Sequence, residues 1–479
     1  MLQPHHFIFL LRPSHKKFCY TLRFYYWTQV EKLMSHAAVV QSEEASLNKF
    51  HVKMVFTAGI GFFTDAYDLF IIGIVSSILA PIWHLSILQV ALLNGAALAS
   101  AAFGAVFFGF FSDRYGRKKL YGFEVLVLFC GAIISACSLS FVTLFIARLI
   151  VGFGIGGDYP SSAVVISENS TRKNRGFLVL LVFAMQAVGL IVGPSLASLL
   201  LASHLSHAVI WRILVGLGAV PAASVFYLRR NIQESPHYLR SKESTPVEVS
   251  RIVRDLAAPK EGLSAYDHQN QKPSLLSKKW LLCLFGTAGA WFLLDVAFYG
   301  NGISSVMIID SIHPHATLLA HTMISAILFL VFAVPGYALA AKYVDKIGRK
   351  PLQFLGFFMM ALMFALIAFI PNLKNMIPLF IILFGVSFFF VNFGPNTTTF
   401  LIPSEIYPTS IRARAHGISA AVGKLGAFVG AFLVPFFIKA YGVFSTMGFM
   451  SIVSVLGILV TIILPEMKNK SLSDVDAGR

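Results

Sequence analysis

Charged side chains are scarce in this sequence, and acidic ones are the scarcer kind. Only 13% of its 479 residues are Asp, Glu, Lys or Arg, about half of the ~25% usual for a soluble domain. There are four cysteines, without the spacing of metal ligands, so neither a disulfide framework nor a cysteine metal site is indicated. This composition excludes a disordered chain and argues against an ordinary cytosolic enzyme.

Several chemical signatures are also missing. The sequence holds no G-x-x-x-x-G-K-[ST] segment, which argues against ATP as a partner and against an ATP-driven pump. It shows no nucleophile–base or metal-ligand spacing, so we expect no enzymatic activity, no metal and no cofactor. The net charge of +16 would suggest nucleic acid in a soluble protein. In a membrane protein, it raises instead the question of where the basic residues lie, and we expect no nucleic-acid partner.

Apolar residues are what the sequence has in abundance. They make up 57% of the chain, and the mean hydropathy is +0.74. Because a spanning helix takes ~20 apolar residues, we predict an all-α integral membrane protein that crosses the lipid bilayer twelve times. The expected spans are roughly 54–80, 87–111, 119–139, 142–167, 175–203, 209–229, 279–303, 316–341, 351–370, 374–403, 412–438 and 442–464.

The longest hydrophilic stretch divides these spans six plus six. The expected units are an N-terminal tail 1–50, a first six-helix bundle 51–230, a central loop 231–278, a second bundle 279–464 and a C-terminal tail 465–479. Basic residues gather in alternate connections, and positive loops stay in the cytoplasm. We therefore expect both termini and the central loop to be cytoplasmic, in a multi-pass protein of a plasma membrane or a bacterial inner membrane.

The first thirty-odd residues form a basic, aromatic segment. It has no clean apolar core or cleavage site of a signal peptide. Met34 offers an alternative start, so we interpret 1–33 as an over-extended gene start or a dispensable tail. An interfacial helix is the alternative.

An internal repeat relates the two bundles. Asp113-Arg-Tyr-Gly116-Arg-Lys follows the second span, and Asp345-Lys-Ile-Gly348-Arg-Lys follows the eighth, 232 residues later. Asp65 and Asp295, in the first and seventh spans, lie 230 residues apart. Because six is even, the two copies have the same orientation in the membrane. Such parallel repeats are typical of transporters whose halves rock around a site at the midplane.

The motifs resemble those of a known family. Gly109-x-x-x-Asp113-Arg-x-Gly116-Arg and Arg148-x-x-x-Gly152-x-Gly154-x-Gly156 are similar to signatures of the major facilitator superfamily. Within this superfamily, further segments are similar to signatures of the phosphate:proton symporters. They are Gly157-Asp-Tyr-Pro160, Gly61-Phe-Phe-Thr-Asp65-Ala-Tyr-Asp68, Trp291-Phe-Leu-Leu-Asp295-x-x-x-Tyr299, Phe393-Gly-Pro-Asn396 and Gly423-Lys424. The resemblance covers about residues 50–472.

Carboxylates inside spans are the candidates for carrying protons, because an ionisable group there is costly and usually functional. Asp65 and Asp68 share a helix face, and two close carboxylates in a low dielectric do not both ionise readily. The alternatives are a solvated pair at a helix end near the cytoplasm, or a partner for the Arg-rich loop. Asp158 precedes Tyr159-Pro160, where proline frees a backbone carbonyl. A salt bridge from Asp158 to Arg148 is the alternative, but ten residues of helix separate them by ~15 Å.

Candidate anion ligands lie in later spans. Trp291, Asp295 and Tyr299 form one helical stripe, and Lys424 is the only lysine deep in an apolar segment. Lys424 either binds an anion or neutralises Asp295 as a structural pair. Asn396 and Gln186 offer amides, or simply join helices. The resemblance implies phosphate ligands at Tyr159, Gln186, Trp291, Asp295, Tyr299, Asn396 and Lys424, and proton carriers at Asp65, Asp68, Asp158 and Asp295. Glu124 and Arg148 are interpreted as structural.

Charged motifs at the cytoplasmic ends are expected to latch that side of the molecule closed. They comprise Asp113, Arg114, Gly116, Arg117, Glu168, Asp345, Arg349 and Glu405. Setting the topology by positive charge is a second role for the same residues.

The resemblance implies proton-coupled uptake of inorganic phosphate by alternating access, with phosphate and protons as the partners. A sugar or organic-ion porter of the same fold, or a phosphate-sensing transceptor, is the alternative.

Overall fold

The computed structural model describes residues 49–115, 122–168, 170, 175–203, 205–229, 274–470 and 472–476. The expected tail 1–33 and most of the central loop lie outside these residues. All regular elements of the described chain are helices, as expected of segments that must satisfy their backbone hydrogen bonds without help from lipid.

The first set of helices holds the first six expected spans. Its members are α2 (Lys49–Ile82), α3 (Ile87–Tyr115), α5 (Phe123–Ala136), α6 (Phe141–Glu168), α7 (Arg175–Leu201), α8 (His207–Gly216) and α9 (Ala219–Arg229). The sixth span is divided between α8 and α9, and α6 stays helical through Pro160.

The second set holds the last six expected spans. Its members are α12 (Lys278–Ile303), α13 (Ser305–Ile312), α14 (Leu318–Leu328), the π-helix η3 (Phe329–Ala333), α15 (Val334–Ile347), α16 (Arg349–Phe369), the 3-10 helix η4 (Leu373–Asn375), α17 (Ile377–Phe393), α18 (Pro395–Glu405), α19 (Thr409–Ile463) and the short α20 (Leu472–Asp476).

Ten helices or helix pairs of the described chain are long and apolar enough to cross a membrane. α5 is a shorter apolar helix, and α19 carries two expected spans because it changes direction at Gly442, whose φ is 81°. All twelve expected spans therefore have a helical counterpart. The helix is broken at Gly394, between α17 and α18, and α18 begins at Pro395, beside Asn396.

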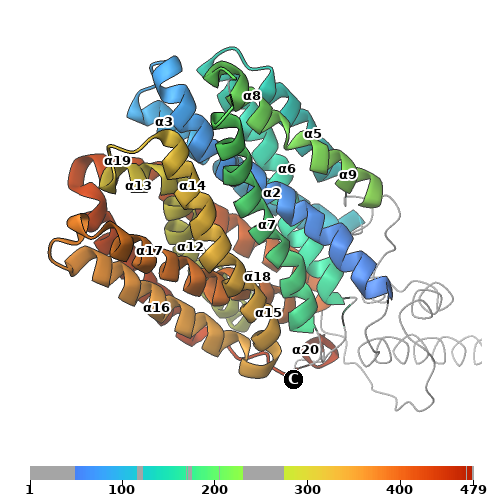
Figure 1. Cartoon of the computed structure of the whole chain (residues 1–479). Coiled ribbons are helices and arrows are strands. Elements are labelled where there is room, and N and C mark those ends of the chain that lie inside the picture. Colours follow the sequence, from blue (N-terminus) through green and yellow to red (C-terminus); the bar gives the residue numbers. More distant parts are fainter. Residues whose placement is uncertain are drawn as a thin grey trace, which may run out of the picture.

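The two sets of helices face each other across the molecule. In Figure 1 the blue-to-green helices occupy one side and the yellow-to-red helices the other, and α2 and α7 run through the middle. α3 packs against α19, α7 against α14 and α15, and α2 against α12 and α13. Side chains from both sets therefore meet along this interface, where the candidate residues lie.

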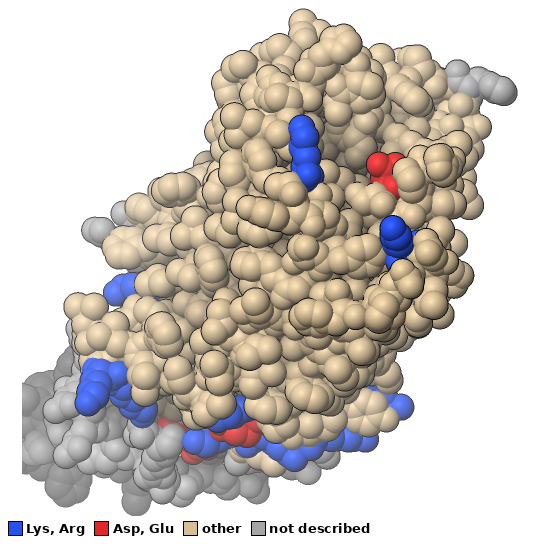
Figure 2. All heavy atoms as spheres, turned by 90° about the vertical axis from the view of Figure 1, so that its left-hand side faces the viewer, with Lys and Arg blue, Asp and Glu red and all other residues tan. Residues whose placement is uncertain are grey.

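Charge is distributed unevenly along the molecule. Figure 2 shows most of the visible Lys and Arg side chains in a band at one end, whereas the flank above that band is nearly free of charge. A long apolar flank of this kind suits contact with lipid.

Candidate functional site

The seven residues expected to bind substrate gather in the middle of the interface. Tyr159 comes from α6, Gln186 from α7, Trp291, Asp295 and Tyr299 from α12, Asn396 from α18 and Lys424 from α19. Each is at most 3% exposed. The cluster draws on both sets of helices, so a movement of one set against the other would alter it.

Lys424 is the cation at the centre of this cluster. Its Nζ donates a hydrogen bond to the hydroxyl of Tyr299 at 2.8 Å and lies 3.4 Å from Oδ2 of Asp295. The same Nζ lies 4.2 Å from the ring centroids of both Tyr159 and Tyr299. Oδ1 of Asp295 is buried and has no hydrogen-bond partner within the described residues. The acid is thus only partly satisfied by its lysine.

Amide and hydroxyl groups extend the cluster toward α15. The Tyr337 hydroxyl donates to Oε1 of Gln186 at 2.6 Å, and Nδ2 of Asn396 donates to the Tyr337 hydroxyl at 2.6 Å. Gln186 in turn lies 3.5 Å from the Tyr299 hydroxyl, which is 3.1 Å from that of Tyr159. Polar groups from both sets of helices therefore form one network. Tyr337 was missed by sequence reasoning, because one tyrosine in an apolar span carries no signal of its own.

Aromatic rings line one side of the cluster. The centroid of Trp291 lies 6.1 Å from that of Tyr159, 6.3 Å from that of Phe400 and 5.6 Å from that of His416. A buried aromatic wall of this kind excludes water and strengthens the electrostatic interactions beside it.

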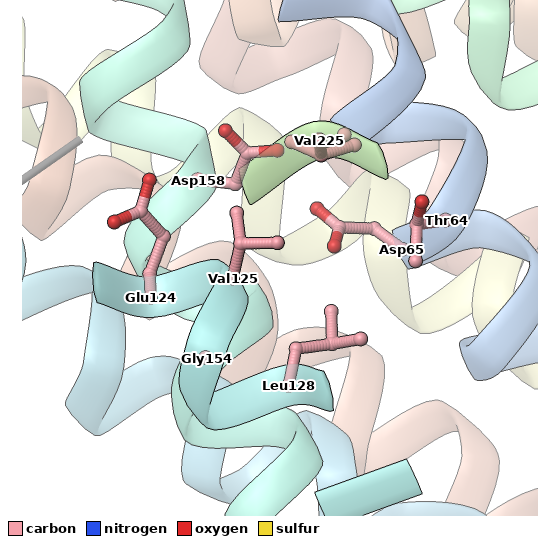
Figure 3. Close-up of a pocket in the computed structure, with 9 residues that line it drawn as sticks. Thr64, Asp65, Glu124, Val125, Leu128, Gly154, Asp158 and Val225 are labelled. Atoms are coloured by element: carbon pink, nitrogen blue, oxygen red, sulfur yellow. The ribbon is translucent and has the colours of Figure 1, made fainter. Parts of the chain in front are cut away.

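A second charged cluster lies nearby, around Arg229 at the end of α9. Arg229 contacts Oε1 of Glu124 at 2.9 Å and Oδ1 of Asp158 at 2.8 Å. Ser162 donates to Asp158 at 2.5 Å. Asp65, Glu124 and Asp158 line a small cavity with about 10 Å³ of space for the centre of a water molecule, which is room for a single water. In Figure 3 the three carboxylates surround this space from three different helices.

Asp65 and Asp68 have different surroundings, although they lie one turn apart on α2. Oδ2 of Asp65 is buried without a hydrogen-bond partner in the described chain, beside Asp158 and Glu124. Asp68 lies 3.8 Å from Arg148, which also donates to the Asp68 carbonyl at 2.7 Å. The alternative of a solvated pair is wrong, because the two residues are 1% and 0% exposed.

The partners of the buried acids differ from those considered in the sequence. Arg148 pairs with Asp68, and Asp158 with Arg229, so the suggested bridge between Asp158 and Arg148 is absent, as the helical spacing predicted. Arg229 was missed because it closes an apolar segment, where an arginine usually reaches the membrane surface. Arg230 follows directly, and two arginines at the end of an apolar segment gave no reason to single out Arg229.

A third charged cluster joins the ends of several helices. Arg349 forms two hydrogen bonds of 2.8 Å with Glu405 and lies 2.9 Å from Asp345. Asp345 also accepts a hydrogen bond of 2.8 Å from the backbone N–H of Phe177, at the start of α7. This bond connects the two sets of helices.

Other parts of the expected latch cannot be placed. The side chains of Asp113, Arg114 and Glu168, and the whole of Gly116 and Arg117, lie outside the described residues. Glu466 joins the cluster without having been predicted, and it accepts hydrogen bonds from the backbone N–H groups of Arg349 and Lys350 at 3.1 and 2.9 Å.

The sequence profile of the "Sugar (and other) transporter" family matches residues 32–478. The chain belongs to this family. Two curated relatives of the transporter are the "Probable inorganic phosphate transporter 1-6" of Arabidopsis thaliana and the "Low affinity inorganic phosphate transporter 1" of Petunia hybrida. Each is 35% identical; the alignments cover 89% and 90% of this chain and 93% of each relative. The resemblance to the phosphate porters is thereby confirmed.

The fold is similar to that of solved transporter structures. The transporter is similar to the proton:xylose symporter XylE of the major facilitator superfamily, with a TM-score of 0.72 and 20% identity over 89% of this chain and 98% of that one. For a partially occluded, inward-open form of XylE from E. coli, the TM-score is 0.71 and the sequence identity is 17%, over 88% of this chain and 100% of that one. The transporter therefore has the major facilitator fold, as expected.

Proposed function

We propose that this protein is a secondary active transporter that takes up inorganic phosphate together with protons by alternating access. Its curated relatives carry the name of inorganic phosphate transporters, and they align with nearly the whole chain. In this proposal the central cluster around Lys424 binds phosphate, and the buried carboxylates carry the protons.

The single observation that carries the proposal is the environment of Lys424. A lysine that is 1% exposed, held by one half-satisfied carboxylate and one phenol, is ready to exchange partners. A phosphate oxygen would replace Asp295 next to Nζ, and such charge-assisted bonds are the strong ones. The amides of Gln186 and Asn396 and the hydroxyls of Tyr159 and Tyr299 supply further donors, and Trp291 closes the aromatic side.

Protonation explains how an acid can share a site with an anion. A charged Asp295 repels phosphate, whereas a protonated Asp295 can donate a hydrogen bond to it. Phosphate would therefore enter from outside with Asp295 protonated. Once the site opens to the cytoplasm and the proton leaves, Asp295 competes again for Lys424 and expels the anion. Asp65, Asp68 and Asp158, all in the first set of helices, give the proton further stations.

The membrane potential sets a lower limit on the number of protons. Moving one negative charge inward against 100 mV costs ~2.3 kcal/mol. A phosphate monoanion with one proton crosses as a neutral unit, while with two protons it is driven inward. We therefore expect two or more protons per phosphate when uptake is electrogenic.

The orientation follows from the charge band. Positive connections remain in the cytoplasm, so the basic end in Figure 2 would be the cytoplasmic one, with both termini on that side. The cluster of Asp345, Arg349 and Glu405 would then close the cytoplasmic end while phosphate binds from outside. A plasma membrane or a bacterial inner membrane provides the proton gradient.

The test is uptake of labelled phosphate into proteoliposomes under an inward proton gradient. We expect wild-type protein to accumulate phosphate, a protonophore to abolish this, and Lys424→Ala to abolish it as well. Lys374→Ala, which removes an exposed lysine far from the cluster, is the matched control and retains uptake. If the wild-type protein takes up no phosphate but accumulates xylose or an organic ion, the proposed substrate is wrong. Binding without counterflow of labelled phosphate would indicate a sensor instead.

A further inference from the structure

A cavity of about 320 Å³ lies away from the central cluster, between the two sets of helices. This size is within the ~300–1,000 Å³ of small-molecule sites. It is lined by α2 and α3 on one side and by the α12–α13 junction and α19 on the other. Figure 1 shows α13 at the end of the molecule opposite α20, so the cavity lies toward the end opposite the basic band.

The chemistry of the lining favours an oxyanion. Lys439 lines the cavity, on the side of the protein where basic residues are rare. Asn94 and Ser304 line it as well, and they are 5% and 3% exposed. The Ser304 hydroxyl and Oδ1 of Asn94 are both buried without a hydrogen-bond partner in the described chain.

Two buried polar groups without partners call for an explanation. A hydroxyl can donate to an anion, and rotation of the Asn94 amide would present its NH₂ group in place of its oxygen. The nearby acid Asp310 does not line the cavity and lies 3.6 Å from Nδ1 of His321. A cation, a hydroxyl and an amide thus share one space without an acid among the lining residues.

The cavity lies in line with the central cluster. Lys439 follows Lys424 by fifteen residues on α19, which corresponds to about 22 Å along a helix. Between the two levels, a Cβ at Gly73 would overlap the carbonyl oxygen of Ile303, so α2 and α12 touch backbone to backbone. One turn deeper, the Phe70 ring lies 5.4 Å from that of Tyr299. This contact separates the cavity from the cluster.

We infer that this cavity is an outer oxyanion site, in which Lys439, Asn94 and Ser304 hold a phosphate before the contact of Gly73 and Phe70 with α12 opens. The identity of the anion rests on the proposed function, but the site itself does not. Because Lys439 is exposed, just before the change of direction of α19 at Gly442, its attraction for an anion is screened by salt. Lys439 therefore sets how readily phosphate reaches the central cluster, whereas the central cluster sets turnover.

The first arm of the test measures uptake kinetics in proteoliposomes. Lys439→Ala raises KM for phosphate about two- to fivefold at low ionic strength, in keeping with the energies of exposed ion pairs, and leaves kcat unchanged. Lys439→Arg keeps the wild-type KM. Lys374→Ala is the matched control, since Lys374 is exposed and does not line the cavity. A KM for Lys439→Ala equal to that of Lys374→Ala overturns the inference.

The second arm measures occupancy without transport. Met307→Cys, a cavity position, is labelled by a charged thiol reagent in the Lys424→Ala background, where the central site is disabled. We expect inorganic phosphate to slow labelling severalfold, and Lys439→Ala to remove this protection. Absence of protection overturns the outer site. If phosphate slows labelling of Met307→Cys but the wild-type protein takes up no phosphate, the outer site stands and only the proposed function is overturned.

The same labelling separates free phosphate from a lipid headgroup, which offers the same oxyanion chemistry. If a lipid fills the cavity, labelling is slow in phosphatidylglycerol vesicles, fast in detergent, and insensitive to inorganic phosphate in both. That outcome contradicts the inference. Protection by phosphate in detergent and in vesicles alike supports it.

Discussion

Three buried cations, Lys424, Arg148 and Arg229, each pair with different buried acids. Lys424 holds Asp295, Arg148 holds Asp68, and Arg229 bridges Glu124 and Asp158. Removing one partner of a buried pair costs far more than the pair contributes, because the remaining charge stays buried. Like Asp68 and Asp295, Asp65 has a carboxylate oxygen without a hydrogen-bond partner within the described residues. At the scale of single residues, charge is therefore arranged so that a proton or an anion can replace a partner.

Tyr337 gives a test of the central network. Tyr337→Phe removes a hydroxyl that donates to Gln186 and accepts from Asn396. We expect KM for phosphate to rise about three- to tenfold with little change in folding, because a net hydrogen bond is worth ~0.5–1.5 kcal/mol. Tyr343→Phe, on the same helix and outside the network, is the control. Equal KM values for the two variants in the uptake assay would show that Tyr337 does not orient the amides.

Arg229 gives a test of the second cluster. Arg229→Ala leaves Glu124 and Asp158 buried without their cation, so we expect the free energy of unfolding to fall by about 3–5 kcal/mol. The measurement is thermal and denaturant unfolding of purified protein in detergent. Arg212→Ala is the control, because Arg212 contacts two backbone carbonyls, at 2.7 and 2.9 Å, and the Trp211 ring, and no acid among the described residues. Adding Glu124→Gln to Arg229→Ala should restore part of the loss; wild-type stability of Arg229→Ala would contradict the ion cluster.

At the scale of elements, small residues and helix breaks decide how closely helices approach. The glycines of α6 allow α3 to pack against its backbone, and the break at Gly394 and Pro395 turns Asn396 into the cluster. These features were visible in the sequence as short motifs. The π-helix η3 and the separate helix α13 were not, because no residue pattern distinguishes them from ordinary helix in an apolar segment.

Packing of α3 against α6 can be tested at Gly156. A Cβ there would overlap the carbonyl oxygen of Ala101, so Gly156→Val must push the two helices apart. We expect little monodisperse protein in size-exclusion chromatography and loss of uptake. Gly448→Ala is the control, since a Cβ at Gly448 meets only Ala368, at 3.6 Å. Normal yield of Gly156→Val would show that the α3–α6 contact tolerates a wider spacing.

At the scale of the whole molecule, the repeat gives equivalent positions but unequal roles. Asp65 and Asp295 are related by the repeat, yet Asp65 adjoins Glu124 and Asp158, whereas Asp295 faces Lys424. The halves are joined at one end by the bond from Phe177 to Asp345, and toward the other by the contact of Gly73 with α12. The central cluster is buried between these two closures.

The latch predicts a shift in conformation. Asp345→Ala removes the bond to Phe177 and one partner of Arg349, so the helix ends that this bond joins should separate more often. Distances between spin labels at Leu181 on α7 and Phe354 on α16, measured by electron–electron double resonance, should gain a longer population. Lys342→Ala, on α15 like Asp345, should leave the distribution of label distances unchanged. An unaltered distribution in Asp345→Ala would assign Asp345 to stability alone.

The class of the protein, its twelve apolar segments and the repeat could be predicted from the sequence alone, and the family resemblance added seven residues of the central cluster, though not Tyr337. Hydropathy adds up along the chain, and motifs are local, so both can be read without a fold. Only the tertiary structure decided which charges meet. Asp158 forms an ion pair with Arg229 on a different helix, and Tyr337 donates a hydrogen bond across the interface to Gln186, 151 residues away in the sequence. Such partners depend on the register in which helices pack, and no local pattern encodes that register.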